Sequence, residues 1–233
     1  QNCTSNAAVT GTGDYTGGIC GENQGGTVTG CTNTGTVSGG SYVGGICGYN
    51  YPESDTKAQI ISCTNAGTVM GTSDSVGGVC GMNSGGTVTE CTNNGAVSGG
   101  SYVGGICGKN SNTYNSNSVL YSAEISSCKN TGNVKGEGDN TGGICGYNHI
   151  SSVQGCRNTG NVKGEGDNTG GICGYNLNGS VQGCHNTGDV TGTGDYTGGV
   201  CGYNPYNKYA ADGKYNTIQK CDNSGTVTGT GGY

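Results

Sequence analysis

The chain repeats one unit of 28 residues in a constant frame from end to end. The copy that begins at Cys156 reads CRNTGNVKGEGDNTGGICGYNLNGSVQG, and other copies begin at Cys3, Cys31, Cys63, Cys91, Cys128, Cys184 and Cys221. A repeat of this length indicates a supersecondary unit that becomes stable only by stacking on its neighbours. The sequence therefore predicts a single repeat domain over residues 1–233, with about seven and a half coils.

Short apolar patches within each unit favour strands over helices. Of 233 residues 53 are Gly and none is Trp or Phe, so large side chains cannot form the core. Val or Ile recurs in three patches per unit, exemplified by Val134, Ile144 and Val153, and Gly and Asn separate the patches. No window places apolar residues at the spacing of a helix face. We expect an all-β parallel solenoid with three short strands per coil, right-handed like most parallel crossovers.

The 15 cysteines fall into two classes that alternate along the chain. One class opens the C-x-N-x-G-x-V motif, and the other lies in G-G-[IV]-C-G-x-N. Because the separation between them inside a repeat is nearly constant, we predict a disulfide in every coil, as in secreted proteins. The predicted pairs are Cys3 with Cys20, Cys31 with Cys47, Cys63 with Cys80, Cys91 with Cys107, Cys128 with Cys145, Cys156 with Cys173, and Cys184 with Cys201, leaving Cys221 unpaired.

Two alternatives to this pairing stay open. Each second cysteine can instead pair with the first cysteine of the next repeat, as in Cys20 with Cys31, which leaves Cys3 unpaired. Cysteine can also serve as a small buried hydrophobic residue without any bridge. Zinc sites of the finger type have little support, because no C-x-x-C pair occurs and the chain has only two His.

Asparagines also recur in register, in two columns exemplified by Asn130 and Asn148. Amides stacked at the strand spacing can donate to one neighbour and accept from the other. We interpret both columns as structural ladders, with amide recognition of a ligand as the alternative.

Three insertions carry the candidate binding residues. They begin at Tyr51, Ser111 and Pro205, and each lies between the second cysteine of one repeat and the first of the next, so they should leave one edge of the solenoid. Tyrosine provides a large contact area with a polar tip. We predict that these loops contact carbohydrate, a host protein or another copy through Tyr51, Tyr114, Tyr121, Tyr203, Tyr206, Tyr209 and Tyr215.

Catalytic and metal-binding arrangements have weak support. His149 and His185 do not lie in a nucleophile motif, so we expect no enzyme. The candidate positions for a polysaccharide-cleaving site are Glu137 with Asp139, Glu165 with Asp167, and Asp14, Asp74 and Asp195, but they occupy the same turn in successive copies. Repeated Gly and Asp also resemble calcium repeats, and the candidate ligands are Asp14, Asp139, Asp167 and Asp195. The simpler interpretation is a turn that needs Gly and Asp for positive φ, and we expect no cofactor.

Charge and hydropathy exclude some partners. The formal net charge is -6 and the nine Lys and Arg are scattered, so nucleic acid is not an expected partner. The apolar runs are too short for a membrane span. The chain begins at Gln1 without Met, which fits both a mature secreted chain and a piece of a longer protein.

The motif pair G-G-[IV]-C-G-x-N and C-x-N-T-G-x-V-x-G resembles the GLUG repeat of bacterial surface proteins, including at Gly17 to Asn23, Gly142 to Asn148 and Gly170 to Asn176. Cys replaces the Val that is usual in the family. The resemblance implies a secreted or cell-surface adhesion scaffold. We add self-association into a head-to-tail fibre as an expectation, because neither end carries a helix, a Pro or a charged cap. The alternatives are a polysaccharide-binding or polysaccharide-cleaving β-helix and a calcium-loaded or metal-loaded solenoid.

Overall fold

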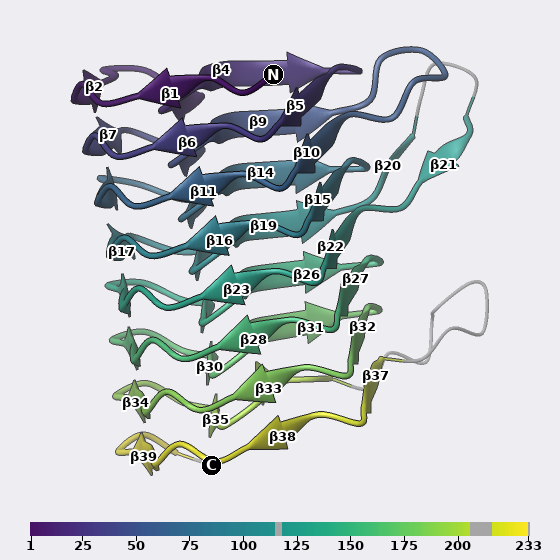
Figure 1. Cartoon of the computed structure of the whole chain (residues 1–233). Helices are drawn as coiled ribbons and strands as arrows, with labels where there is room; N and C mark the ends of the chain where they lie inside the picture. The colour runs from purple at the N-terminus through teal and green to yellow at the C-terminus, as the bar shows by residue number, and fades with distance from the viewer. Residues whose placement is uncertain (115–117, 206–215, 233) are drawn as a thin grey trace.

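The computed structural model describes residues 1–114, 118–205 and 216–232 as a stack of coils (Figure 1). Each coil adds one short strand to each of up to five parallel sheets, here called sheets I to V in chain order. Sheets I and II have 8 strands, and sheets III, IV and V have 7. The predicted all-β parallel solenoid is therefore confirmed.

The strands of each sheet follow the coil order. Sheet I contains β1 (Thr4–Ser5), β6 (Thr32–Asn33), β11 (Thr64–Asn65), β16 (Thr92–Asn93), β23 (Lys129–Asn130), β28 (Arg157–Asn158), β33 (His185–Asn186) and β38 (Asp222–Asn223). Sheet II contains β2 (Val9–Thr10), β7 (Val37–Gly39), β12 (Val69–Gly71), β17 (Val97–Gly99), β24 (Val134–Gly136), β29 (Val162–Gly164), β34 (Val190–Gly192) and β39 (Val227–Gly229). Sheet III contains β3 (Thr16–Gly17), β8 (Val43–Gly44), β13 (Val76–Gly77), β18 (Val103–Gly104), β25 (Thr141–Gly142), β30 (Thr169–Gly170) and β35 (Thr197–Gly198).

Sheets IV and V complete the coil. Sheet IV contains β4 (Cys20–Gln24), β9 (Cys47–Tyr51), β14 (Cys80–Ser84), β19 (Cys107–Ser111), β26 (Cys145–His149), β31 (Cys173–Leu177) and β36 (Cys201–Tyr203). Sheet V contains β5 (Thr27–Thr29), β10 (Gln59–Ile61), β15 (Thr87–Thr89), β22 (Glu124–Ser126), β27 (Ser152–Gln154), β32 (Ser180–Gln182) and β37 (Thr217–Gln219). The separate antiparallel pair β20 (Thr113–Tyr114) and β21 (Leu120–Tyr121) lies outside the coil.

The coil has more strands than the sequence predicts. Sheets I and III consist of strands of only two residues, such as Thr92–Asn93 and Thr141–Gly142. Strands this short do not produce an apolar patch, because each contributes a single side chain to the interior, the other residue being Gly in sheet III and outward-facing in sheet I. The expectation of three strands per coil was therefore too low.

Two apolar clusters fill the interior. The larger one combines both cysteine classes with the Ile or Val that precedes the second cysteine and with the central residue of the sheet V strands, as in Cys128, Ile144 and Ile125. The smaller cluster consists of Val from sheets II and III, such as Val97 and Val103. Small β-branched side chains fit here because each coil buries few residues on a narrow cross-section.

The Gly-Gly doublet of each unit is required for space rather than for unusual backbone angles. A Cβ on Gly104 would lie 2.0 Å from the carbonyl oxygen of Cys107. A Cβ on Gly105 would lie 2.2 Å from the Gly143 oxygen and 2.4 Å from the Asn130 amide. Neither glycine has a positive φ. The two halves of the repeat motif thus meet in space, because the Asn of one coil packs on the Gly-Gly doublet of the coil before it.

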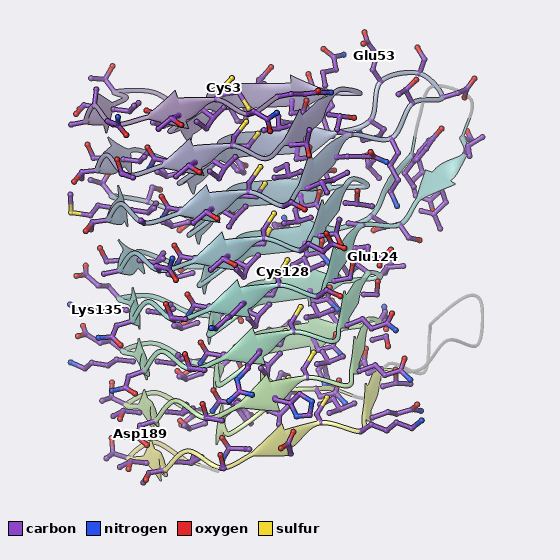
Figure 2. All side chains as sticks on the ribbon, in the orientation of Figure 1. Cys3, Glu53, Glu124, Cys128, Lys135 and Asp189 are labelled. Carbon is purple, nitrogen blue, oxygen red and sulfur yellow. The ribbon has the colours of Figure 1, made fainter. Side chains whose placement is uncertain are left out.

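The cysteines do not form the predicted intra-coil disulfides, and all of them, from Cys3 to Cys221, are free thiols. Their neighbours explain this result. Each second-class cysteine pairs in register with its equivalent in the next coil, as Cys107 does with Cys145. Figure 2 shows sulfur atoms repeating along the stack between the labelled Cys3 and Cys128 and beyond. The interpretation of cysteine as a small buried residue describes this structure, whereas neither disulfide scheme does.

The thiols also satisfy polar backbone groups at the corners of the coil. The backbone N–H of Cys63 donates to Sγ of Cys91 at 3.4 Å, and that thiol donates to the carbonyl oxygen of Thr89 at 3.2 Å. In the second class, the Cys107 thiol donates to the Lys109 carbonyl at 3.1 Å. Val could fill the same volume, but it has no group for these bonds.

In the part of the chain that the structure describes, sheet III contains buried hydroxyls without hydrogen-bond partners, and substitution can restore the stability that they cost. Thr141 and Thr169 are buried in register with Val103, and neither Oγ1 has a hydrogen-bond partner among the described residues. We expect Thr141→Val and Thr169→Val each to raise the free energy of unfolding by about 1 kcal/mol, because an unpaired buried hydroxyl costs that much or more. Urea denaturation measures the change.

Thr131→Val is the matched control for these two substitutions. The Thr131 hydroxyl donates to Oδ1 of Asn94 at 2.9 Å, so its removal should not stabilise the chain. Equal stabilisation by all three substitutions would contradict the explanation, because β-propensity alone would then account for it.

Candidate binding edge

Two of the three insertions meet at one edge of the solenoid. The segment after β9 and the β20–β21 pair project from the same side of the stack (Figure 1). They also touch, because the Tyr121 hydroxyl donates to the carbonyl oxygen of Ser54 at 3.4 Å. The third insertion, with Tyr206, Tyr209 and Tyr215, lies outside the described residues except for its ends. The structure therefore brings together Tyr51, Tyr114 and Tyr121 of the predicted set.

A small open pocket lies between these two insertions. Its volume is about 340 Å³, and its lining includes Tyr49, Tyr51, Glu53 and Tyr114. The Tyr49 and Tyr51 rings stack at 4.5 Å, whereas the Tyr114 side chain is 64% exposed. The pocket thus combines aromatic surface with a carboxylate and with the Gln24 amide, which is a common composition for a ligand site.

Further tyrosines lie on sheet IV in later coils, beyond Met82 and Lys109 at the same register position, and of these the sequence prediction named only Tyr203. Tyr147, Tyr175 and Tyr203 pair in register on successive coils, and the Tyr147 and Tyr175 rings stack at 5.3 Å. Tyr15 stacks on Tyr49 at 5.3 Å. Tyr42, Tyr102 and Tyr196 lie at the corner before sheet III. The signal was present in the sequence, because several copies of C-G-x-N have Tyr at x.

Burial shifts the pKa values of two side chains on sheet IV. Burial and the neighbouring Tyr175 and Tyr102 hydroxyls raise the pKa of Tyr147 to about 12. Burial and the positive charge of Lys109 lower the pKa of His149. Both side chains are therefore neutral near pH 7, and the Tyr147 hydroxyl is able to donate a hydrogen bond.

The repeated aspartates connect neighbouring turns. Oδ1 of Asp139 accepts the backbone N–H of Asp167 at 2.9 Å, and Oδ1 of Asp167 accepts that of Asp195 at 2.8 Å. Positive φ occurs at the residue after the Asp, as in Asn140 and Asn168. The expectation that Gly and Asp themselves need positive φ in this turn was therefore wrong.

The calcium and carboxylate candidates do not converge on a site. Among the described residues, no group of three or more His, Cys, Asp and Glu is placed to hold a metal ion. Glu137 and Glu165 form ion pairs with Lys135 and Lys163 at 3.1 and 3.2 Å. Asp14, Asp74 and Asp195 occupy the same turn as Asp139 in other coils. His185 lies on the outer face of sheet I, where it contacts Asp222.

Both asparagine columns are continuous buried ladders. The Asn130 amide donates to Oδ1 of Asn158 and to the Gly132 carbonyl, both at 2.8 Å. In sheet IV, Asn148 donates to Oδ1 of Asn176 at 2.8 Å. The interpretation of these columns as structural is confirmed, because the amides bind one another inside the coil.

Comparison with known protein families finds one motif in three segments of the chain. The GLUG motif matches residues 12–38, 39–70 and 166–191. No curated protein and no solved structure matches the chain. No helix among the described residues is long and apolar enough to cross a membrane. Three segments of the chain are therefore similar to the GLUG motif, and their coils share one register with the rest of the stack.

Proposed function

We propose that the chain is a secreted or cell-surface adhesion scaffold. Its binding surface is the pocket between the two insertions, lined by Tyr49, Tyr51 and Tyr114 and here called the tyrosine-lined edge. The observation that carries the proposal is the contact between two insertions from different coils, which together enclose the pocket around Tyr51 and Tyr114. Loops held on a rigid scaffold are common sites of recognition. The proposal assigns no catalytic role.

Carbohydrate is the ligand class that the pocket fits best. Tyr114 offers an exposed aromatic ring, while Glu53 and Gln24 supply polar groups for hydroxyls. The rigid Tyr49–Tyr51 stack requires little ordering when a ligand binds. A host protein is the alternative ligand, and it would use the same aromatic anchors.

The double variant Tyr51→Ser with Tyr114→Ser tests this proposal. We expect it to lose roughly tenfold or more in affinity for the oligosaccharides that the parent chain binds on an immobilised panel, because aromatic anchors dominate such sites. Biolayer interferometry measures the change. The solenoid should keep its denaturation midpoint, because neither ring belongs to the two apolar clusters.

Tyr102→Ser is the matched control, because Ser75 occupies the equivalent corner in the preceding coil. We expect it to leave binding unchanged. The proposal would be wrong if the double variant bound as tightly as the parent. A parent chain that bound nothing on the panel would contradict the carbohydrate assignment.

A further inference from the structure

A column of basic residues runs along the outer face of sheet I. The outward residue of this sheet is Thr in the first coils, at Thr4, Thr32, Thr64 and Thr92. In the next three coils it is Lys129, Arg157 and His185, which pair in register. All three are exposed, and their strands β23, β28 and β33 lie one below another on the face toward the viewer in Figure 1.

The stability of the fold does not explain why basic residues occupy these positions. Equivalent atoms of adjacent strands lie about 4.8 Å apart, so Lys129 and Arg157 place like charges directly opposite each other, which is unfavourable. In the part of the chain that the structure describes, neither has an ion-pair partner. By contrast, Lys135 and Lys163 on sheet II are paired with Glu137 and Glu165. Thr at the same position in four coils shows that the coil forms without a cation there.

Within four residues of either cation the chain carries no carboxylate, and the acidic residues of the same coils, such as Glu137 and Glu165, lie further along, after sheet II. Gln154 and Ser126 flank the column on sheet V, and Thr131, Asn133 and Asn161 follow it on the other side. In neighbouring coils, Glu90, Asp189 and Asp222 occupy positions of the repeat within five residues of the position of Lys129 and Arg157. The result is a narrow strip of positive charge bordered by amides and hydroxyls, parallel to the stack axis.

We propose that this strip binds a linear acidic polysaccharide that lies along the stack axis. Carboxylate or sulfate groups of successive sugars would pair with Lys129 and Arg157, and the flanking amides of Gln154 and Asn161 would bind the hydroxyls. This surface is separate from the tyrosine-lined edge and does not depend on it. Nucleic acid fits less well, because its closely spaced phosphates require more cations than this strip offers and the chain carries a net charge of -6.

The test compares polygalacturonate, heparin and neutral dextran as probes on the full chain. We expect binding to at least one acidic polymer and none to dextran. The double variant Lys129→Thr with Arg157→Thr restores the residue of the earlier coils, so the fold should be unaffected. It should bind roughly tenfold or more weakly, because two unpaired cations are lost. Binding should also weaken at about 0.5 M NaCl, which screens exposed charges.

Lys135→Thr with Lys163→Thr is the matched control, because it removes the same charge from residues that are already paired with glutamates. We expect it to reduce binding less than about threefold, since neutralised cations contribute little. Equal loss in both double variants would overturn the proposal, because net charge would then explain the binding. Binding to dextran, or to neither acidic polymer, would also overturn it. Binding to polygalacturonate but not heparin would identify carboxylates as the recognised groups. Binding to heparin but not polygalacturonate would identify sulfates.

Two further outcomes separate this proposal from the others. The Tyr51→Ser and Tyr114→Ser variant should keep full binding to the acidic polymer, whichever way its own test ends. Light scattering should show the same particle size for the parent and for the Lys129→Thr and Arg157→Thr variant. If the substitutions instead changed self-association and left polymer binding intact, the strip would be a contact between copies and the proposal would be wrong.

Discussion

The free energy of unfolding will fall steeply as the pH rises above about 8.5 in reducing buffer. Burial raises the pKa of the Cys80 and Cys128 thiols well above the ordinary value, and it also raises that of Cys145. In the unfolded chain the same thiols ionise near their usual pKa of about 8.5. Above that pH the unfolded state binds fewer protons than the folded state, so stability is lost as the pH increases.

The size of the effect follows from the number of thiols. A thiol with an unfolded pKa of about 8.5 that stays protonated in the folded chain removes about 1 kcal/mol between pH 8.5 and 9.5, so these three remove about 3 kcal/mol. Urea denaturation at a series of pH values measures the loss. Below about pH 8 their contribution is fully present, and stability should not change through these groups.

The control replaces the three thiols with Val at Cys80 and Cys145 and with Ala at Cys128. This variant should lose stability at neutral pH, because the hydrogen bonds of the three thiols are removed. Above pH 8.5 its stability should fall less steeply than that of the parent, and the remaining dependence comes from thiols such as Cys173 and Cys201, whose pKa values are also raised. A parent chain with constant stability from pH 7 to about pH 9.5 would show that the buried thiols are not linked to folding in this way.

Asn130→Ala will cost the chain about 3 kcal/mol or more. Asn130 is completely buried, accepts from Asn93 at 2.8 Å, and donates to Asn158 and Gly132. Alanine leaves three buried polar groups without these bonds, and each such group costs about 1 to 3 kcal/mol. Urea denaturation measures the loss, and hydrogen exchange should show weaker protection in the two neighbouring coils.

Asn223→Ala is the matched control, because Asn223 is the last asparagine of the same column. Asn223 makes the equivalent bonds to Asn186 and Gly225, but it is exposed, so water can replace the amide. We expect a loss below about 1 kcal/mol. The first described coil has a natural exception, because Ser5 pairs in register with Asn33 and Oδ1 of Asn33 remains unpaired. Similar losses at Asn130 and Asn223 would contradict the ladder as a source of stability.

The sequence predicted part of the candidate binding surface and missed the rest. Tyr51, Tyr114 and Tyr121 lie at one edge, because insertions at one point of the repeat must leave one edge of a solenoid, and their role in binding stays a prediction. The wider tyrosine face was not predicted, although Tyr147 and Tyr175 recur at a fixed position. Two side chains share an outer face only if no corner of the coil separates them. The corners lie beside the two-residue strands of sheets I and III, and strands this short cannot be predicted from the sequence pattern.

The sequence by itself determined the parallel stack, its register and the two asparagine ladders. A fixed period forces identical residues of successive coils into contact, so the column of Asn130 follows from the spacing alone. Only the tertiary structure decided the state and neighbours of the cysteines and the number of strands in each coil. A constant separation between Cys128 and Cys145 follows from a constant coil path whether or not they are bonded, so spacing could not distinguish a bridge from two thiol columns.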